Sequence, residues 1–487
     1  IMIDQILYQL DNPWKLFVLF LFLIISLILI CEFGYKKKIL SASSNRIIIH
    51  LFIGLAVSAS PFLFSNNIQP IILAFLFLFI NLISYKNNKL KSFHDIGRES
   101  LGTIYFPLSF ILIGGPFWDY SYQIAASYII LAVADPLASF VGSRKIKAHN
   151  YNIAGDIKSI EGSVIMFTAT LVLITLLSDF IFIDFDILNT IIAIIICSIA
   201  ITFSESISFK GSDNLTIPIT AFLFIELFNH LNQNNFLSEF LFIIILIFIF
   251  LFYFFRKKHL SLSGFISANF MGTLIVGFGG LDHLIPISIF FISSTILSKF
   301  NNHQTMNLES NRNAAQVFAN GGLALLLCII NHFYPNNFLY YSFIAAIAAA
   351  NSDTWGTEIG KFSKTNPIDI ISRKKLETGE SGGVTAMGIV GSLLGSLLIS
   401  LTGYLFKIDV KYLMMIFMSG FFASLFDSII GSSFQSRFIS KSGLIISESY
   451  IKNYYLFTGD KRLNNDAVNF LCTVSSPLFL ITIDTVL

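Results

Sequence analysis

Apolar runs of about twenty residues recur from one end of this chain to the other. A run of that length is what an α-helix needs to cross the hydrocarbon core of a bilayer, which is roughly 30 Å thick. Only 12% of the 487 residues are charged, which is about half of the share found in soluble domains. We therefore expect an all-α fold, in the form of a polytopic bundle of transmembrane helices.

Sixteen runs qualify as membrane spans, and they fall into two sets of eight. The first set covers about residues 14–33, 46–65, 68–84, 101–115, 120–141, 161–178, 182–203 and 214–231. The second set covers about residues 238–255, 262–280, 282–298, 314–333, 337–351, 383–405, 411–431 and 467–486. The runs 101–115 and 337–351 are short enough to be re-entrant, so we expect 14–16 spans.

Basic residues gather in the loops that follow odd-numbered spans, for example in Lys36–Lys38 and Arg256–Lys258. The alternate loops are neutral or acidic, as in Asp179–Asp186, with Lys407 and Lys411 as the main exceptions. The positive-inside rule then predicts that the basic loops are cytoplasmic and that both termini lie outside. We expect a multi-pass protein of a bacterial inner membrane or of a thylakoid or plastid membrane.

Two classes of site are disfavoured by composition. The four cysteines (Cys31, Cys197, Cys328 and Cys472) each sit alone in an apolar run, and no paired His or Cys spacing typical of zinc occurs. The net charge is +2, and no basic block marks a nucleic-acid partner.

Polar residues that look out of place in apolar surroundings recur in both halves. Asp135 is followed seven residues later by Gly142, and Asp353 is followed at the same spacing by Gly360. Further pairs follow in the same order with spacings that agree to within four residues: Arg98 with Arg312, Gly162 with Gly382, and Glu205 with Asp427. Each half closes with an acid–amide pair, Asp213-Asn214 or Asn465-Asp466. This order predicts a parallel internal repeat, with one membrane domain at residues 1–235 and another at 236–487.

These residues suit phosphoryl transfer. Carboxylates with hydroxyls and glycine turns are typical of Mg²⁺ sites that also bind phosphates, and basic side chains neutralise triphosphate oxygens. We expect the backbone at Gly162-Ser163 and Gly382-Gly383 to lie directly before a helix, where N–H groups bind anions. No P-loop motif occurs. Gly388, Gly391 and Gly395 are interpreted as helix-packing residues.

Longer motifs carry a resemblance to two families. The first half resembles the phytol kinase/dolichol kinase family of CTP-dependent polyprenol kinases, in Arg46-Ile-Ile-Ile-His50, Arg98–Pro107, Ala134–Gly142, Lys158–Ser163, Glu205 and Ser212–Pro218. The second half resembles the membrane family that contains phytyl-phosphate kinases, in Arg312–Val317, Asn320-Gly321, Asn351–Gly360, Glu377–Gly379, Gly382–Thr385, Asp427–Gly431, Gln435 and Asn464–Asn469. Ala134 stands where relatives of the first family commonly have glycine.

The resemblance implies a bifunctional membrane kinase that converts a prenol such as phytol or geranylgeraniol to its monophosphate and then its diphosphate, for prenyl-lipid salvage. It implies CTP as the first donor, CTP or another nucleoside triphosphate as the second, and Mg²⁺ or Mn²⁺ as the metal. The bilayer, the prenol, its monophosphate and the nucleotide are the expected partners.

Roles follow for individual residues. The expected metal ligands are Asp135, Asp213, Asp353, Asp427 and Asp466. Asp135, Asp353 and Asp427 are expected to be catalytic, together with Glu205 as the base for the prenol hydroxyl. The expected nucleotide- or phosphate-binding residues of the first half are Arg98, Arg144, Lys145, Lys158, Ser159, Glu161, Gly162 and Asn214. Those of the second half are Arg312, Thr357, Glu358, Arg373, Gly379, Gly382, Gly383 and Asn465.

Two alternative functions remain open from the sequence. One is a CTP-dependent cytidylyltransferase acting on a lipid phosphate, which would release pyrophosphate. The other is a secondary transporter, which the internal repeat suggests. Transporter sites lie near the bilayer midplane on broken helices, whereas the polar clusters here gather toward one membrane face.

Overall fold

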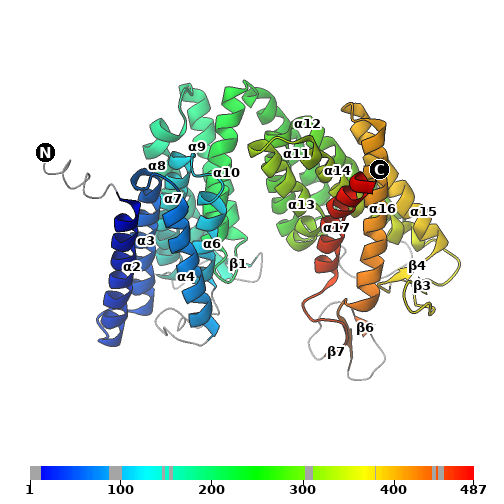
Figure 1. Ribbon diagram of the computed structural model, residues 1–487, viewed down its shortest axis with the longest axis horizontal. Coiled ribbons are helices and arrows are strands. Elements are labelled where there is room, and N and C mark those ends of the chain that lie inside the picture. The colour runs from blue at the N-terminus through cyan, green and yellow to red at the C-terminus, as the bar shows by residue number, and fades with distance from the viewer. Residues whose placement is uncertain are drawn as a thin grey trace. The chain divides into compact units, whose positions relative to one another are not determined.

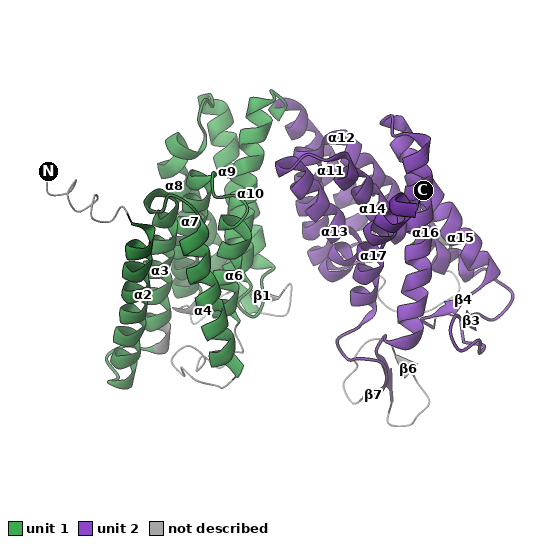
Figure 2. Cartoon of the chain, viewed as in Figure 1, with its two compact units in different colours: residues 1–237 green, residues 238–487 purple. Residues whose placement is uncertain are grey.

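The computed structural model describes residues 12–86, 101–144, 149–152, 157–301, 311–378, 380–440, 446–447 and 454–486. Within these ranges the chain divides into two compact units, residues 1–237 and 238–487 (Figure 2). Each unit is a bundle of helices with short strands at one end (Figure 1). The predicted all-α polytopic fold is therefore confirmed.

The first unit contains eight described helices and one hairpin. The helices are α2 (Pro13–Lys36), α3 (Ala42–Leu63), α4 (Ile68–Lys86), α6 (Gly102–Gly114), α7 (Ser121–Arg144), α8 (Ile160–Ile181), α9 (Ile187–Ser206) and α10 (Asp213–Gln233). Between α7 and α8 lies an antiparallel hairpin of β1 (Asn150–Asn152) and β2 (Ile157–Ser159).

The second unit contains seven described helices and two small sheets. The helices are α11 (Leu237–Arg256), α12 (Leu262–Asn301), α13 (Ala314–Phe333), α14 (Asn337–Gly360), α15 (Ala386–Leu405), α16 (Val410–Ser433) and α17 (Asn465–Val486). The strands are β3 (Ile368–Asp369), β4 (Gly383–Val384), β5 (Arg437–Ile439), β6 (Ile446–Ser447) and β7 (Tyr455–Thr458). They pair as β3–β4 and as β6–β5–β7, all antiparallel.

Every expected span falls on one of these helices, and 13 of the described helices are long and apolar enough to cross a membrane. The expected spans 262–280 and 282–298 form the two arms of α12, which is broken at Gly280 (φ 65°, ψ −160°). That positive φ is open to glycine and costly for other residues. Helix α14 continues nine residues beyond its expected end at position 351, because its last turns are polar but still helical.

The two units share part of their helix packing. In the first unit α7 packs against α3, α8 and α10, and α9 packs between α8 and α10. In the second unit α14 packs against α12, α15 and α17, and α16 packs between α15 and α17; α14 additionally packs against α13 and α16, more extensively than α7 packs against α6 and α9. The predicted repeat thus has a counterpart in the packing within each unit.

Capping residues set where the functional helices begin. Ser159 caps α8 by accepting the backbone N–H of Gly162 at 3.1 Å, and Thr385 caps α15 by accepting that of Gly388 at 2.9 Å. Gly142 lies beside Gly162, as Gly360 lies beside Gly388. The structural counterpart of Gly162 is therefore Gly388. The spacing in the sequence had indicated Gly382, and that pairing is wrong.

The packing role expected for Gly391 and Gly395 is confirmed. A Cβ at either position would lie within 2.8 Å of a backbone oxygen of α14. Small residues allow such close approach of helices. Helix α14 also contains a fully buried run of small and aliphatic side chains at residues 345–349. This packing fixes the end of α14 that carries Asp353.

Candidate functional site

The end of the first bundle at the β1–β2 hairpin brings together three buried carboxylates. Asp135 comes from the last turns of α7, Glu205 from the end of α9 and Asp213 from the start of α10, and each is at most 8% exposed. Burial of acids is costly unless cations or hydrogen bonds compensate. The cluster therefore needs basic neighbours.

Lys158 supplies the main compensating charge. The hairpin register places it opposite Tyr151, and its Nζ lies 2.5 Å from Oε1 of Glu205 and 3.9 Å from Oδ2 of Asp213. Burial lowers the pKa of Lys158, but attraction by Glu205 and Asp213 outweighs burial, and the pKa lies above its usual range. Lys158 is therefore a charged ammonium group at neutral pH.

Asp135 interacts electrostatically with Asp213, His50, Arg46 and Lys158. His50 was part of a motif in the sequence but carried no expected role. Its Nε2 lies 2.5 Å from Oδ1 of Asn214, although 164 residues separate the two in the chain. Only the packing of α3 beside α10 could reveal this contact.

Several expected nucleotide contacts of the first unit have local structural partners. The hydroxyl of Ser159 is occupied with the N–H of Gly162, so that N–H is not directed at an external anion. Glu161 accepts from the backbone N–H of His149 at 3.2 Å and lies 3.2 Å from the ring Nδ1 of His149. Arg98 and Lys145 lie outside the described residues, as does the side chain of Arg144.

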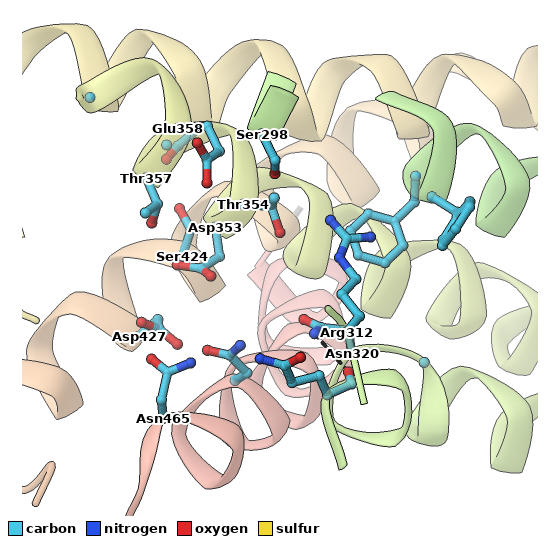
Figure 3. Close-up of a pocket in the computed structure, with 18 of the residues that line it drawn as sticks. Ser298, Arg312, Asn320, Asp353, Thr354, Thr357, Glu358, Ser424, Asp427 and Asn465 are labelled. Atoms are coloured by element: carbon cyan, nitrogen blue, oxygen red, sulfur yellow. Dashed lines mark hydrogen bonds between the residues drawn. The ribbon is translucent and has the colours of Figure 1, made fainter. Parts of the chain in front are cut away.

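The second unit holds a cavity of about 650 Å³. Asp353, Thr357 and Glu358 reach it from α14, Asp427 from α16 and Asn465 from the start of α17. Figure 3 shows Asp353 and Asp427 on one side of this space with Ser424 between them.

Arg312 lies on the opposite side of the same cavity (Figure 3). Its guanidinium donates to Oγ of Ser294 at 3.1 Å and sits 5.7 Å from the ring centroid of Phe291. Burial lowers the pKa of Arg312, while the charge of Glu358 opposes this shift. An arginine stays protonated in any case, so the cavity presents a cation facing a group of acids.

Two expected residues of the second unit do not line this cavity. Arg373 is exposed in the loop before β4, with φ 58°, and Asp466 lies next to the lining residue Asn465 but is not itself part of the lining. Gly382 and Gly383 do line it, but they lie before β4 and in it, so α15 begins only at Ala386. The expected helix N-terminus at these glycines is absent, because Gly383 pairs in β4 and the cap of α15 is Thr385. Gly379 lies outside the described residues.

The cavity also contains polar residues to which the sequence assigned no role, although most of them lie within the quoted motifs. They are Thr354, Ser381, Thr385, Ser424 and Ser428, with Gln316, Asn320 and Asn469 on the facing helices. Ser424, for example, stands three residues before Asp427 in α16, which is a spacing that places two side chains on one helix face. That periodicity was the signal available in the sequence.

The residues present fit a hard divalent cation in part. Among the residues that the structure describes, no three His, Cys, Asp or Glu side chains converge to hold a metal by themselves. Mg²⁺ usually takes one or two carboxylates and completes its shell with phosphate oxygens and water. Asp135 and Asp213 provide such a pair near Lys158, and Asp353 and Asp427 provide one across the cavity from Arg312.

Comparison with known proteins gives the family. Residues 245–476 match the family described as "Integral membrane protein DUF92". By this stretch the chain belongs to that family of integral membrane proteins. The uncharacterized membrane protein MJ0933 of Methanocaldococcus jannaschii is 30% identical over 222 residues, which cover 45% of this chain and 83% of the relative.

The chain is also similar to two further proteins. The phytol kinase of Synechocystis sp. is 31% identical over 199 residues, 40% of this chain and 83% of that enzyme. The protein PGR of Arabidopsis thaliana is 27% identical over 252 residues, 45% of this chain and 86% of the relative. No solved structure matches.

Proposed function

We propose that the protein is a membrane kinase that phosphorylates an isoprenoid alcohol. The observation that carries the proposal is the cluster of Asp135, Glu205 and Asp213 around Lys158 at one end of the first bundle. Likeness to a phytol kinase supports it. A site at the end of a lipid-immersed bundle lets a water-soluble nucleotide meet an acceptor that resides in the bilayer.

In the first unit, Asp135 and Asp213 would hold Mg²⁺ with the nucleotide, CTP, while Lys158 offers its charge to the phosphates. When bound, Mg²⁺ would neutralise oxygens of the triphosphate and orient it. The 3.9 Å separation between Lys158 and Asp213 leaves the lysine within reach of an anion on that side.

The second unit would carry the second phosphorylation, from prenyl monophosphate to diphosphate, with CTP or another nucleoside triphosphate as donor. Its cavity is roomier than a metal site requires and lies in the size range of small-ligand pockets. Asp353 and Asp427 would hold the metal, and Arg312 faces them from the other side, where a second phosphate would need a cation. Recycling of prenyl side chains is the process that such a pair of steps serves.

The position of the polar groups favours a kinase over a transporter. Glu205 lies in the last turn of α9 and Asp213 at the first residue of α10, so both are at helix ends and not at the middle of a span.

One experiment separates the three functions. Purified protein in lipid nanodiscs is incubated with a prenol panel and CTP labelled either at the γ-phosphate or at the α-phosphate, and the lipids are separated. Label from the γ-position in the lipid product supports the kinase. Label from the α-position supports the cytidylyltransferase and contradicts the kinase, and no labelled lipid with any prenol contradicts both.

A further inference from the structure

The first unit contains a second feature, a largely apolar cavity of about 320 Å³ enclosed by α2, α3, α4 and α6. Its lining runs from Arg46 to Ser60 on α3 and from Pro70 to Ser84 on α4. At 1.5 Å per residue, each stretch is about 21 Å long. The cavity is therefore long and narrow, and it extends over most of a bilayer's hydrocarbon thickness.

The two ends of this cavity differ in chemistry. At one end lie Arg46, His50, Asn81, Ser84 and Asn214. The other end is apolar and is formed by Phe20, Phe64, Leu73, Ala74 and Phe110, with Phe20 and Phe64 in edge-to-face contact at 5.3 Å between ring centroids. The fitting occupant is a single long hydrocarbon chain with a small polar group at one end.

The wall between α2 and α4 gives such a chain a way in from the membrane. Leu29 of α2 and Ile80 of α4 both line the cavity, yet they are 62% and 40% exposed on the outer surface of the bundle. An apolar side chain that faces both the cavity and the lipid marks an opening between the two. The occupant therefore arrives laterally from the bilayer.

The polar end of the cavity is continuous with the acid cluster. Asn214 lines the cavity, and its neighbour Asp213 contacts Lys158. Asp135 interacts electrostatically with both Arg46 and His50 of the cavity. A polar group at this end of the occupant therefore lies beside the residues proposed to hold the nucleotide.

Hydrogen bonds select the tautomer of a neutral His50 ring. The Nδ2 of Asn214 donates to Oδ1 of Asp213 at 3.0 Å and to the backbone oxygen of Gly211 at 3.2 Å, which leaves Oδ1 of Asn214 as the acceptor facing His50. The ring therefore donates from Nε2. In a neutral imidazole the other nitrogen is then an acceptor, and this Nδ1 is buried with no hydrogen-bond partner among the described residues.

We infer that this cavity holds the isoprenoid chain of the alcohol substrate, with the substrate hydroxyl donating to Nδ1 of His50, and that His50 is the general base. The inference rests on the proposed kinase function. It assigns the base to His50 instead of Glu205, because Glu205 is already paired with Lys158 at 2.5 Å. As Nδ1 takes the hydroxyl proton, the alcohol oxygen bonds to the γ-phosphorus of the nucleoside triphosphate. The bond to the β–γ bridging oxygen breaks, and the nucleoside diphosphate leaves.

The base assignment is tested with His50→Gln, which removes the proton-accepting nitrogen but retains an amide that can bond Asn214. General-base catalysis typically contributes a factor of about 10²–10⁴. We expect kcat for prenol phosphorylation to fall in that range while KM for the prenol changes by only a few fold. His230→Gln is the matched control, because His230 lies at the end of α10 opposite to Asn214, and this change should leave both constants unchanged. A kcat within threefold of the wild type for His50→Gln would overturn the assignment.

The chain site is tested by changing its length. Ala74→Phe fills the apolar end, and activity should fall at least tenfold more with the longest accepted prenol than with the shortest. Phe64→Ala should extend the range toward longer prenols. Leu76→Phe is the control, because Leu76 lies on the exposed side of α4, the helix that carries Ala74, and it should leave the length profile unchanged.

The outcomes separate this inference from the function on which it rests. Wild-type protein that phosphorylates no prenol contradicts the kinase itself. Wild-type activity with an unchanged length profile in Ala74→Phe and Phe64→Ala contradicts the chain site and leaves the kinase intact. A photoreactive prenol with its diazirine at the hydrocarbon end provides a readout independent of turnover, and it should label the apolar end of the cavity, on α2, α4, α6 or at Phe64. Labelling confined to helices that do not line the cavity also overturns the chain site.

Discussion

Nζ of Lys158 lies 2.5 Å from Oε1 of Glu205, and this contact joins the β1–β2 hairpin to the C-terminal end of α9. Both side chains are largely buried, at 17% and 10% exposure. Removing one partner of a buried ion pair leaves the other charge uncompensated, which typically costs about 3–5 kcal/mol. The pair therefore bears on stability as well as on catalysis.

We predict that Lys158→Met lowers the unfolding free energy of the first unit by about 3 kcal/mol and abolishes prenol phosphorylation. Because the folded pKa of Lys158 is raised, its contribution is complete below the unfolded pKa of about 10.4 and is lost as pH rises through the folded pKa. The loss of unfolding free energy in Lys158→Met relative to the wild type should thus be the same at pH 7 and pH 9. Denaturant unfolding in detergent measures it.

The control is Lys361→Met, which removes the half-exposed ion pair of Lys361 with Glu358 at 3.0 Å. Exposed pairs contribute about 0–1 kcal/mol, so this variant should unfold nearly like the wild type. Equal losses for the two lysines would refute the importance assigned to burial at Lys158.

Asp369 gives a prediction of opposite pH dependence. Its carboxylate accepts from the backbone N–H groups of Ile371 and Ser372 and from the hydroxyl of Ser432, joining the loop 361–385 to α16. Burial raises the pKa of Asp369, but these hydrogen bonds outweigh burial, and the pKa lies below its usual value. Its stabilisation is present above the unfolded pKa of about 3.9 and is lost as pH falls through the folded pKa.

Asp369→Asn should therefore lower stability by about 1–2 kcal/mol at pH 7. The difference in stability between Asp369→Asn and the wild type should become smaller when the pH is lowered below about 4. Thermal melts at pH 7 and pH 3.5 test this, and a gap that widened in acid would show that the carboxylate is not the stabilising group.

Packing of α14 against α15 is tested at Gly395. A Cβ there would lie 2.8 Å from the backbone oxygen of Asn351 and 2.9 Å from Cβ of Trp355. Overpacking of this kind typically costs about 1–3 kcal/mol, so Gly395→Ala should destabilise the second unit by that amount. Gly322→Ala in α13 is the control: its nearest contact would be 3.7 Å away, and it should be neutral or slightly stabilising. A neutral Gly395→Ala would contradict the close approach.

Divalent metal should be essential for both steps, since carboxylate pairs beside basic residues are the donor groups present. Excess EDTA should abolish activity, and Mg²⁺ or Mn²⁺ should restore it. Full activity in EDTA would remove the roles given to Asp135, Asp213, Asp353 and Asp427.

Helix positions were readable from the sequence because apolar runs and caps are local signals. The expected span 214–231, for example, became α10 at Asp213–Gln233. Loop geometry was not readable. Gly382 was matched with Gly162 because spacing alone does not show that the loop 361–385 contains β3 and β4. The N-cap residues Ser159 and Thr385 mark the equivalent helix starts.

The candidate site was readable only in part. Acids stood out because charges are rare in apolar runs, and the structure gathers Asp135, Glu205 and Asp213 in one unit. The hydrogen bond from His50 to Asn214 joins positions far apart in the chain, and no periodicity encodes it. The role of Glu205 as a base was inferred without knowing that Lys158 contacts it.

The most direct test of the account supplies purified protein with prenol and with prenyl monophosphate in separate reactions and compares Asp135→Asn with Asp353→Asn. Each change removes one carboxylate charge while keeping the shape, and the loss should exceed about a hundredfold in its own step. Asp135→Asn should stop prenol phosphorylation and still convert added monophosphate, whereas Asp353→Asn should accumulate monophosphate, and Asp427→Asn should behave like Asp353→Asn. Loss of both steps in either folded variant, or of neither step in both, would contradict two separate kinase sites in one chain.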